Sequence, residues 1–314
     1  KGFADGVAAS GTSHTFTNLD PGTTYYFKVS AVNTGGESFP TPTVAARTPQ
    51  VGSTNIPYLI VDGFDRIDRS GAIYRYESAS LGNVRRLFLE KMNSYDYAVE
   101  HAQAMSTCNA CGIAFDGALN EALIDGNLTL YTGSANYYEG INWFLGEEST
   151  VDRTFDPTEA GLVSTFLDNG GNLIVSGAEI GWDIGRSTSG NANTAFYNNY
   201  LKSSYAGDSG GTYDFTGTGI FAGTSGSFDD GTEEYNASYP DRIATTGGSA
   251  IALNYSGGTG DGAAVSYKGT FGVVNFGFPL ETITSDAVRE ALMCTAIEYL
   301  APPLSMASVS ITNI

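Results

Sequence analysis

Charged and polar side chains follow each of five short segments that the sequence predicts to be strands of one sheet. In chain order the five groups are Asp62, Asp65 and Arg66; His101; Glu147 and Glu148; Ser176, Glu179, Trp182 and Asp183; and Glu281. Ligands of an open parallel sheet bind outside the carboxyl ends of its strands, where the strand order reverses. Parallel strands would therefore bring these side chains to one edge of the sheet. Loops that are polar without forming a site would give the same composition.

Two carboxylates and a histidine at such an edge would suit acid–base catalysis. Glu147 and Glu179 are candidates for a pair of the kind that cleaves glycosidic bonds, and His101 is a candidate for proton transfer near neutral pH. The candidates for substrate binding are Asp65, Arg66, Glu148, Trp182 and Asp183. Trp182 would stack on a sugar ring. The alternatives are a His101 held by a hydrogen bond in the core and a Trp182 half buried in a lid.

Other motifs give weaker signals. Ser176 lies at a strand-to-helix turn, but "VSGAEIG" lacks the G-x-S-x-G elbow of a serine nucleophile. The segment "FDDGTEEY" gathers four carboxylates around a glycine, which is consistent with a Ca²⁺ loop or with a solvated loop: Asp229, Asp230, Glu233 and Glu234. The sequence has no phosphate-binding or dinucleotide-binding glycine motif, so we expect no cofactor, with Ca²⁺ at this loop as the alternative.

Strand and helix patterns alternate between residues 57 and 301. Buried strands are expected at 58–64, 95–102, 137–149, 172–183 and 271–279, and helices at 81–94, 116–128, 156–169 and 285–300. Asp156, Pro157 and Glu159 form a strong helix start. Residues 190–265 are rich in Gly, Ser, Thr and Tyr and are expected to form an insertion with many loops. The alternation predicts an α/β fold with a doubly wound, mostly parallel sheet.

The first fifty residues show two segments of period-two alternation joined by the turn "LDPGT". They resemble the late strands of a fibronectin type III domain at Leu19, Pro21, Gly22, Tyr25, Phe27, Val29, Ala31 and Asn33. The resemblance implies that the Tyr25 hydroxyl bonds back to the chain, as in a tyrosine corner. It covers residues 1–48, the second half of an all-β sandwich, so we expect the chain to have been cut upstream. Residues 49–56 would be a linker, and 302–314 a linker or the start of a further module.

The α/β portion, residues 57–301, carries the segments "LIVDGFDR", "INWFLGEES", "GGNLIVSGAEIGWD" and "VVNFGFPLE". In these it resembles a domain of large secreted bacterial proteins labelled N-acetylmuramoyl-L-alanine amidase or xanthan-lyase-like. More distantly it resembles the class I glutamine-amidotransferase-like fold, which implies a flavodoxin-like sheet. The catalytic cysteine of that superfamily sits after the strand matching "NLIVSG", where this sequence has Ser176 to Glu179.

Composition excludes several classes of partner. With 15 Lys and Arg against 34 Asp and Glu, the formal charge is −19, which disfavours nucleic acids and anionic membranes. No segment approaches the ~20 consecutive apolar residues of a membrane span. Cys108 and Cys111 form a lone C-x-x-C pair, for which a local disulfide or two ordinary thiols is expected rather than zinc, and Cys294 falls in an apolar helix pattern.

These observations together predict a secreted, extracellular or cell-surface component of a multidomain protein. It would act on a polysaccharide or peptidoglycan as a hydrolase or a lyase, next to other modules of the same polypeptide. The alternatives are a non-catalytic glycan-binding module and a structural or adhesive module, the latter stabilised by Ca²⁺. An enzyme requires the candidate carboxylates, or a carboxylate and His101, to converge in one cleft.

Overall fold

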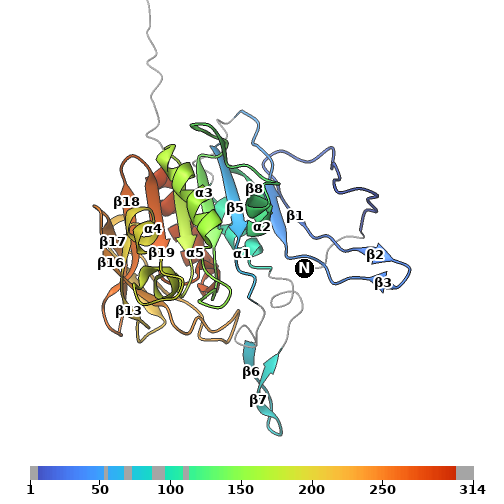
Figure 1. Ribbon diagram of the computed structural model, residues 1–314. Helices are drawn as coiled ribbons and strands as arrows, with labels where there is room; N and C mark the ends of the chain where they lie inside the picture. Colours follow the sequence, from blue (N-terminus) through green and yellow to red (C-terminus); the bar gives the residue numbers. More distant parts are fainter. Residues whose placement is uncertain (1–5, 53–55, 67–72, 87–95, 109–112, 302–314) are drawn as a thin grey trace, which may run out of the picture.

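The computed structural model describes residues 6–52, 56–66, 73–86, 96–108 and 113–301. Within these ranges thirteen strands form one mixed sheet (Figure 1). Its centre is five parallel strands in the spatial order β8 (Ile113–Leu119), β5 (Ile56–Asp62), β11 (Gly140–Phe144), β12 (Asn172–Ser176) and β19 (Gly272–Phe276). None of the described helices is long and apolar enough to cross a membrane. The mixed α/β fold predicted from the sequence is confirmed at this level.

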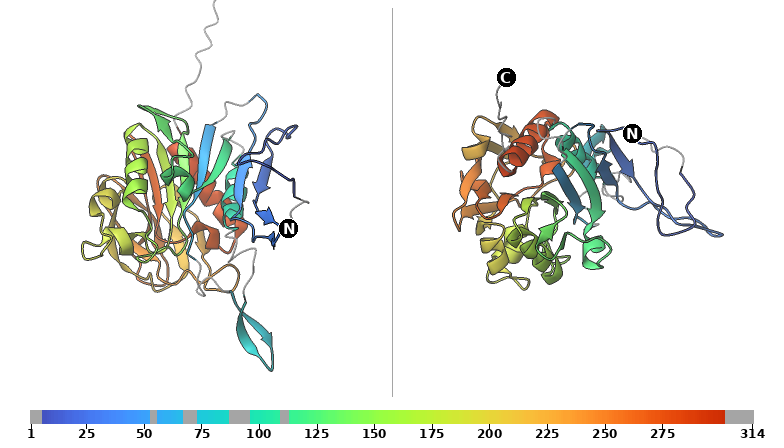
Figure 2. Two further views of the ribbon diagram at one scale, coloured as in Figure 1. Left: turned by 45° about the vertical axis from the view of Figure 1, so that its right-hand side comes forward. Right: turned by 90° about the horizontal axis from the view of Figure 1, so that it is seen from above.

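Helices cover both faces of the parallel strands (Figure 2). On one face, α1 (Ala98–Ser106) and α5 (Asp286–Leu300) pack on Ile60, Phe144 and Ile174. On the other, α2 (Asn120–Ile124) and α3 (Pro157–Asp168) pack on Leu59, Trp143 and Val175. The central strands are buried on both sides, which explains why they read as continuous apolar runs and not as alternating ones.

Antiparallel strands extend the sheet beyond β19. They are β18 (Gly262–Lys268), β17 (Ala250–Tyr255), β14 (Asp214–Gly217), β15 (Ser225–Ser227), β16 (Asp241–Thr245) and β13 (Ser203–Asp208). The shorter elements nearby are η3 (Gly181–Gly185), α4 (Thr194–Asn199), η4 (Gly219–Phe221) and η5 (Leu280–Thr282). Residues 190–265 therefore contribute most of this extension, and they are more regular than the loop-rich insertion that their composition suggested.

The N-terminal segment joins the opposite edge of the same sheet. β1 (Thr24–Phe27) pairs with β4 (Val44–Arg47), and β4 lies beside β8, with Arg47 opposite Phe115. The pairs β2 (Val32–Asn33) with β3 (Gly36–Glu37), and β9 (Tyr131–Thr132) with β10 (Ala135–Asn136), form small separate ribbons. The Tyr25 hydroxyl accepts a hydrogen bond from the Asp20 amide at 2.8 Å, which confirms the expected bond back to the chain.

Local sequence signals predicted some elements correctly. α3 begins with the predicted capping box: Asp156 accepts from the Glu159 amide at 2.8 Å, and Glu159 accepts from the Asp156 amide at 2.7 Å. Pro157 follows at the first helical position. The strands predicted near β5, β11, β12 and β19 and the helix predicted at α5 are also present.

Three predicted elements are wrong. Most of residues 95–102, expected as a strand, belong to α1. Residues 116–128, expected as a helix, begin as part of β8, and the helix is limited to α2. In the segment 81–94, expected as a helix, β7 (Gly82–Arg86) pairs with β6 (Ile73–Ser78) in a hairpin that projects from the body (Figure 1), and residues 87–94 lie outside the described ranges.

The cysteine prediction is also wrong. Cys108, after α1, forms a disulfide with Cys294 of α5, 186 residues away in the sequence. The bond joins the two helices that cover one face of the sheet. Cys111 lies outside the described residues.

Candidate functional site

The chain reverses direction across the sheet at β5. From β5 it passes to β8 on one side and then returns to β11 on the other, so the loops that follow β5 and β11 lead away from each other. This is the position at which an open α/β sheet forms a ligand crevice. A cavity of about 770 Å³ lies here, lined by Asp65, Arg66, Glu147, Ser149, Thr150, Val151, Asp152, Ala178, Glu179, Trp182, Ser238 and Tyr239.

Five of the eight predicted site residues line this cavity: Asp65, Arg66, Glu147, Glu179 and Trp182. They come from the loops after β5, β11 and β12, as expected for side chains at the carboxyl ends of neighbouring parallel strands. Each of these five residues therefore lies at the edge of the sheet where we expected it.

Glu148 holds two of the loops together beneath the cavity. Its side chain is 1% exposed and does not line the cavity. One carboxyl oxygen, Oε1, accepts the amides of Asp65, at 2.9 Å, and of Arg66. Burial and the nearby Asp65 carboxylate raise the pKa of Glu148 to about 9, so Glu148 is neutral at pH 7. We predicted a substrate-binding residue; the structure places Glu148 behind the residues that line the cavity.

The two candidate acid–base carboxylates are both held by hydrogen bonds. Glu147 Oε1 accepts the amide of Ser238 at 3.3 Å, and Glu179 Oε2 accepts the hydroxyl of Ser149. Burial raises the pKa of Glu179, and the nearby Asp208 raises it further, while the bond from Ser149 opposes the change. A half-buried carboxyl with a raised pKa holds its proton to higher pH than a solvated one, as a general acid must.

Together with Asp65, Arg66 and Trp182 form the rest of the cavity wall that the sequence predicted. Arg66 Nη1 donates to the main-chain oxygen of Glu147 at 2.8 Å. Trp182 lies in the π-helical turn η3, a conformation often found at functional sites. The amides of Gly181 and Trp182 donate to the buried carboxylate of Asp241, which fixes the start of this turn.

Asp183 lies outside the cavity, contrary to the substrate-binding role predicted for it. It is fully buried, and its Oδ2 accepts the amide of Thr154 at 2.9 Å and the hydroxyl of Thr154 at 3.0 Å. Its Oδ1 accepts the side-chain amide of Asn191 at 2.8 Å. All of these bonds connect neighbouring loops, so the carboxylate stabilises the structure around the cavity.

His101 also lies away from the cavity, because it belongs to α1 and not to a strand end. It is 1% exposed, and its ring stacks on Phe144 with 4.4 Å between centroids. Nδ1 lies 3.0 Å from the amide nitrogen of Asn142, which can only donate, so Nε2 carries the proton. Nε2 donates to Glu281 Oε2 at 3.1 Å. Glu281 Oε1 accepts the Tyr235 hydroxyl at 2.6 Å, which completes a buried network.

The remaining candidates from the sequence are buried or closed on themselves. Asp62 accepts the Phe64 amide at 3.1 Å, and burial raises the pKa of Asp62 well above its usual value. Ser176 is fully buried and does not line the cavity. Asp229 accepts the amides of residues 231–234, which closes the loop proposed for Ca²⁺ around its own carboxylate. Among the described residues no three His, Cys, Asp or Glu side chains lie close enough to hold a metal ion.

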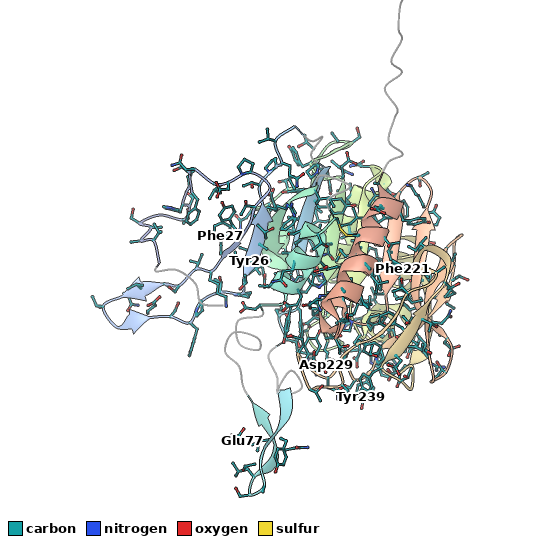
Figure 3. The ribbon with its side chains drawn as sticks, turned by 180° about the vertical axis from the view of Figure 1, so that it is seen from behind. Tyr26, Phe27, Glu77, Phe221, Asp229 and Tyr239 are labelled. Atoms are coloured by element: carbon teal, nitrogen blue, oxygen red, sulfur yellow. A yellow bond between two sulfur atoms is a disulfide. The ribbon has the colours of Figure 1, made fainter. Side chains whose placement is uncertain are left out.

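The sequence did not predict Ser149, Asp152, Ser238 or Tyr239 as cavity residues. Ser149 and Asp152 continue the loop that begins with Glu147. A predicted site that extended a few residues further along this loop would have included them. Ser238 and Tyr239 come from the segment before β16 and carry no local signal. Figure 3 shows Tyr239 and Asp229 at the end of the body from which the β6–β7 hairpin, labelled at Glu77, projects.

Comparison with known proteins supports the N-terminal assignment. The family model of the fibronectin type III domain matches residues 4–47, which confirms that part of the sequence prediction. No curated protein matches the chain.

Several solved structures are weakly similar. An exo-β-1,4-mannosidase from Opitutaceae bacterium strain TAV5 has a TM-score of 0.45 and 13% identity over 79% of this chain and 37% of its own. A GH42 β-galactosidase from G. stearothermophilus has a TM-score of 0.43 and 10% identity over 78% of this chain and 30% of its own. A cytoplasmic protein from Salmonella typhimurium has a TM-score of 0.42 and 9% identity over 78% of this chain and 99% of its own. This chain thus spans about a third of the length of the two glycosidases, and these scores assign no function to it.

Proposed function

We propose that the cavity binds an extracellular polysaccharide or peptidoglycan, and that Glu147 and Glu179 act there as an acid–base pair in hydrolysis or lyase cleavage. One observation carries the proposal. Glu147 and Glu179 come from loops 32 residues apart in sequence (147 to 179) and line one cavity of about 770 Å³ with the aromatic rings of Trp182 and Tyr239. Carboxylates beside aromatic rings are the side chains that a glycan-cleaving site requires.

The roles of the two carboxyls follow from their surroundings. Glu179, with its raised pKa, would donate the proton to the leaving oxygen. Glu147 would accept a proton, from water in hydrolysis or from a sugar carbon in a lyase reaction. Arg66, bonded to the main chain of Glu147, would orient the substrate beside it. His101 is left out of the pair because it lies on α1 and is buried against Phe144 and Glu281.

We also propose that the α/β portion is flavodoxin-like. In sequence order the parallel strands are β5, β8, β11, β12 and β19, which gives the spatial order 2-1-3-4-5 of that fold. α1 and α5 lie on one face, and α2 and α3 on the other. The turn after β12 contains Ser176 and no cysteine, so the nucleophilic chemistry of the amidotransferases does not enter the proposal.

Export from the cell is part of the same proposal. The Cys108–Cys294 disulfide is of the kind that persists in oxidising compartments. A fibronectin type III segment next to the α/β portion suits a protein built from several extracellular modules.

A second function, a glycan-binding module without catalysis, is favoured by a different observation. Glu179 accepts the Ser149 hydroxyl and Glu147 accepts the Ser238 amide, so both carboxylates already have hydrogen-bond partners within the protein. In such a module the two groups would shape the cavity and bind sugar hydroxyls. No proton transfer would be required of them.

The two functions are separated by measuring cleavage and binding on the same polysaccharide panel. Hydrolysis is followed by new reducing ends and lyase cleavage by the absorbance of unsaturated products. For an enzyme we expect Glu147→Gln and Glu179→Gln to lower the rate about 10²–10⁴-fold while binding persists. Asp125→Asn is the matched control, because Asp125 is exposed and lies outside the cavity lining. If the wild-type protein binds a polysaccharide but does not cleave it, the function is that of a glycan-binding module.

A further inference from the structure

The segment 228–240 carries Ser238 and Tyr239 to the cavity. It connects β15 to β16, and throughout its described length it belongs to no helix and to no strand of the sheet. Ser238 and Tyr239 both line the cavity, and the amide of Ser238 donates to Glu147 Oε1 at 3.3 Å. Without a continuous ladder of backbone hydrogen bonds, the course of such a segment depends on individual contacts. The contacts that hold residues 228–240 therefore decide where this wall of the cavity lies.

Asp229 folds the first part of the segment. Its carboxyl group accepts the amides of residues 231–234, three of them at 2.9–3.0 Å. Its main-chain oxygen accepts the amide of Ala237 at 3.2 Å. Tyr235, which lies between these bonded positions, is fully buried. The acidic run that suggested a Ca²⁺ loop thus leads a tyrosine into the interior.

The Tyr235 hydroxyl is bound to a buried carboxylate. It donates to Glu281 Oε1 at 2.6 Å, and Glu281 Oε2 accepts from Nε2 of His101 at 3.1 Å. A buried carboxylate requires such donors, so loss of the hydroxyl would remove the donor to one of its oxygens. Through this bond the segment is tied to η5, which carries Glu281, and to α1, which carries His101.

The Tyr235 ring also lies behind other walls of the cavity. Its centroid is 5.5 Å from that of Phe64 and 5.2 Å from that of Tyr97. Phe64 directly precedes the cavity residues 65 and 66, and its ring occupies the space that a side chain on Gly146 would need. Gly146 in turn precedes Glu147. One buried ring therefore contacts, directly or through Phe64, the loops that follow β5 and β11.

We propose that Tyr235 is a positioning residue of the cavity, which holds the wall of Ser238 and Tyr239 in place against the loop of Glu147. Tyr235 is buried and is not one of the lining residues, so it acts through them and not on a ligand. The inference rests on the proposed function for the use of the cavity as a glycan site. It adds the side chain on which the shape of that site depends.

Hydrogen exchange of the whole chain, followed by mass spectrometry, tests the positioning. Tyr235→Phe keeps the ring and removes only the hydroxyl. We expect the amides of residues 236–239 to exchange about tenfold faster, as for the loss of one hydrogen bond to a charged group, while the parallel strands keep their wild-type rates. Asp229→Asn weakens the same segment at a different point and should give the same local increase.

Tyr138→Phe is the matched control. The Tyr138 hydroxyl donates to a carboxylate oxygen of Asp116 at 3.0 Å. Tyr138 precedes β11, at the end of that strand opposite to Glu147, and lies outside the cavity lining. The control removes the same kind of bond by the same substitution, so exchange at residues 236–239 should stay at the wild-type rate.

The effect on the site is measured with a polysaccharide that the wild-type protein cleaves. For Tyr235→Phe we expect kcat to fall about tenfold, because a displaced Glu147 is no longer oriented for the transition state. KM should change less than about threefold, because Tyr235 does not line the cavity. Tyr138→Phe should leave both constants unchanged.

Several results would overturn the inference. They are unchanged exchange at residues 236–239, faster exchange throughout the sheet, and a local increase in exchange with kcat unchanged. Failure of the proposed function is a separate result. If the wild-type protein cleaves no polysaccharide while Tyr235→Phe loosens only residues 236–239, the positioning by Tyr235 stands and the enzyme is refuted.

Discussion

Replacing Glu148 by glutamine is expected to make the stability of the protein less dependent on pH. Glu148 is buried, and its pKa is raised from 4.5 to about 9. Between these values the folded protein keeps a proton on Glu148 that the unfolded chain has lost. The contribution of Glu148 to the free energy of unfolding is therefore fully present below the pKa of 4.5 that it has in the unfolded chain. This contribution is lost as the pH rises toward 9.

The size of the effect follows from the one proton involved. Stability falls by about 1.4 kcal/mol per pH unit within this window, or about 3 kcal/mol between about pH 6 and pH 8. Glutamine keeps an oxygen that can accept the amides of Asp65 and Arg66, and it has no proton to lose. The loops should therefore remain in place while this part of the pH dependence disappears.

Urea unfolding of both proteins at several pH values between about 6 and 8 measures the difference. Glu159, whose pKa is raised to about 7, adds its own pH dependence to both proteins, so the comparison of wild type with variant isolates Glu148. The reasoning would be refuted if the free energies of unfolding of the two proteins changed in parallel with pH. That result would mean that Glu148 is ionised in the folded state.

Three further predictions concern contacts that the sequence did not reveal. His101→Ala removes the donor to the buried Glu281 carboxylate and should lower the free energy of unfolding by about 3 kcal/mol in urea titrations; a loss below about 1 kcal/mol would contradict the network. Reducing the Cys108–Cys294 disulfide should cost about 2–4 kcal/mol, seen as a lower Tm with reductant, and an unchanged Tm would argue against the bond. Gly117→Ala places a Cβ 2.4 Å from the Ala45 oxygen and should detach β4 from β8, so limited proteolysis should release the N-terminal segment faster; an unchanged rate would contradict the tight contact.

Sequence patterns predicted elements whose signals are local. The capping box of Asp156 and Glu159 gave the start of α3, and apolar runs gave β5, β11, β12 and β19. Because side chains that follow parallel strands share one edge, the order of the strand patterns was enough to group Asp65, Glu147 and Glu179.

α1 shows how a short segment can mislead. The short segment "YDYAVEHA" was predicted to be a strand, yet Ala98, His101, Ala102 and Met105 are buried with the i, i+3, i+4, i+7 spacing of a helix. The helical stripe continues to residue 105, beyond the segment taken as a strand. Interpreting His101 as a strand-end residue followed from that error.

The features that the sequence did not predict depend on contacts between residues far apart in the chain. The Cys108–Cys294 pairing spans 186 residues, and no local spacing indicates it. Ser238 and Tyr239 reach the cavity from the antiparallel extension of the sheet, whose pairing depends on contacts across the whole domain. Asp183 follows a strand in a polar segment, which suggested exposure, but hydrogen bonds from Thr154 and Asn191 hold it in the interior.

The most direct test of the central claim is a crystal structure of the Glu179→Gln variant with a bound oligosaccharide. The account predicts sugar rings in the cavity against Trp182, with a glycosidic oxygen within hydrogen-bonding distance of the residue 179 side chain and Glu147 on the same sugar. An oligosaccharide bound elsewhere on the protein, with this cavity empty, would contradict the proposed site.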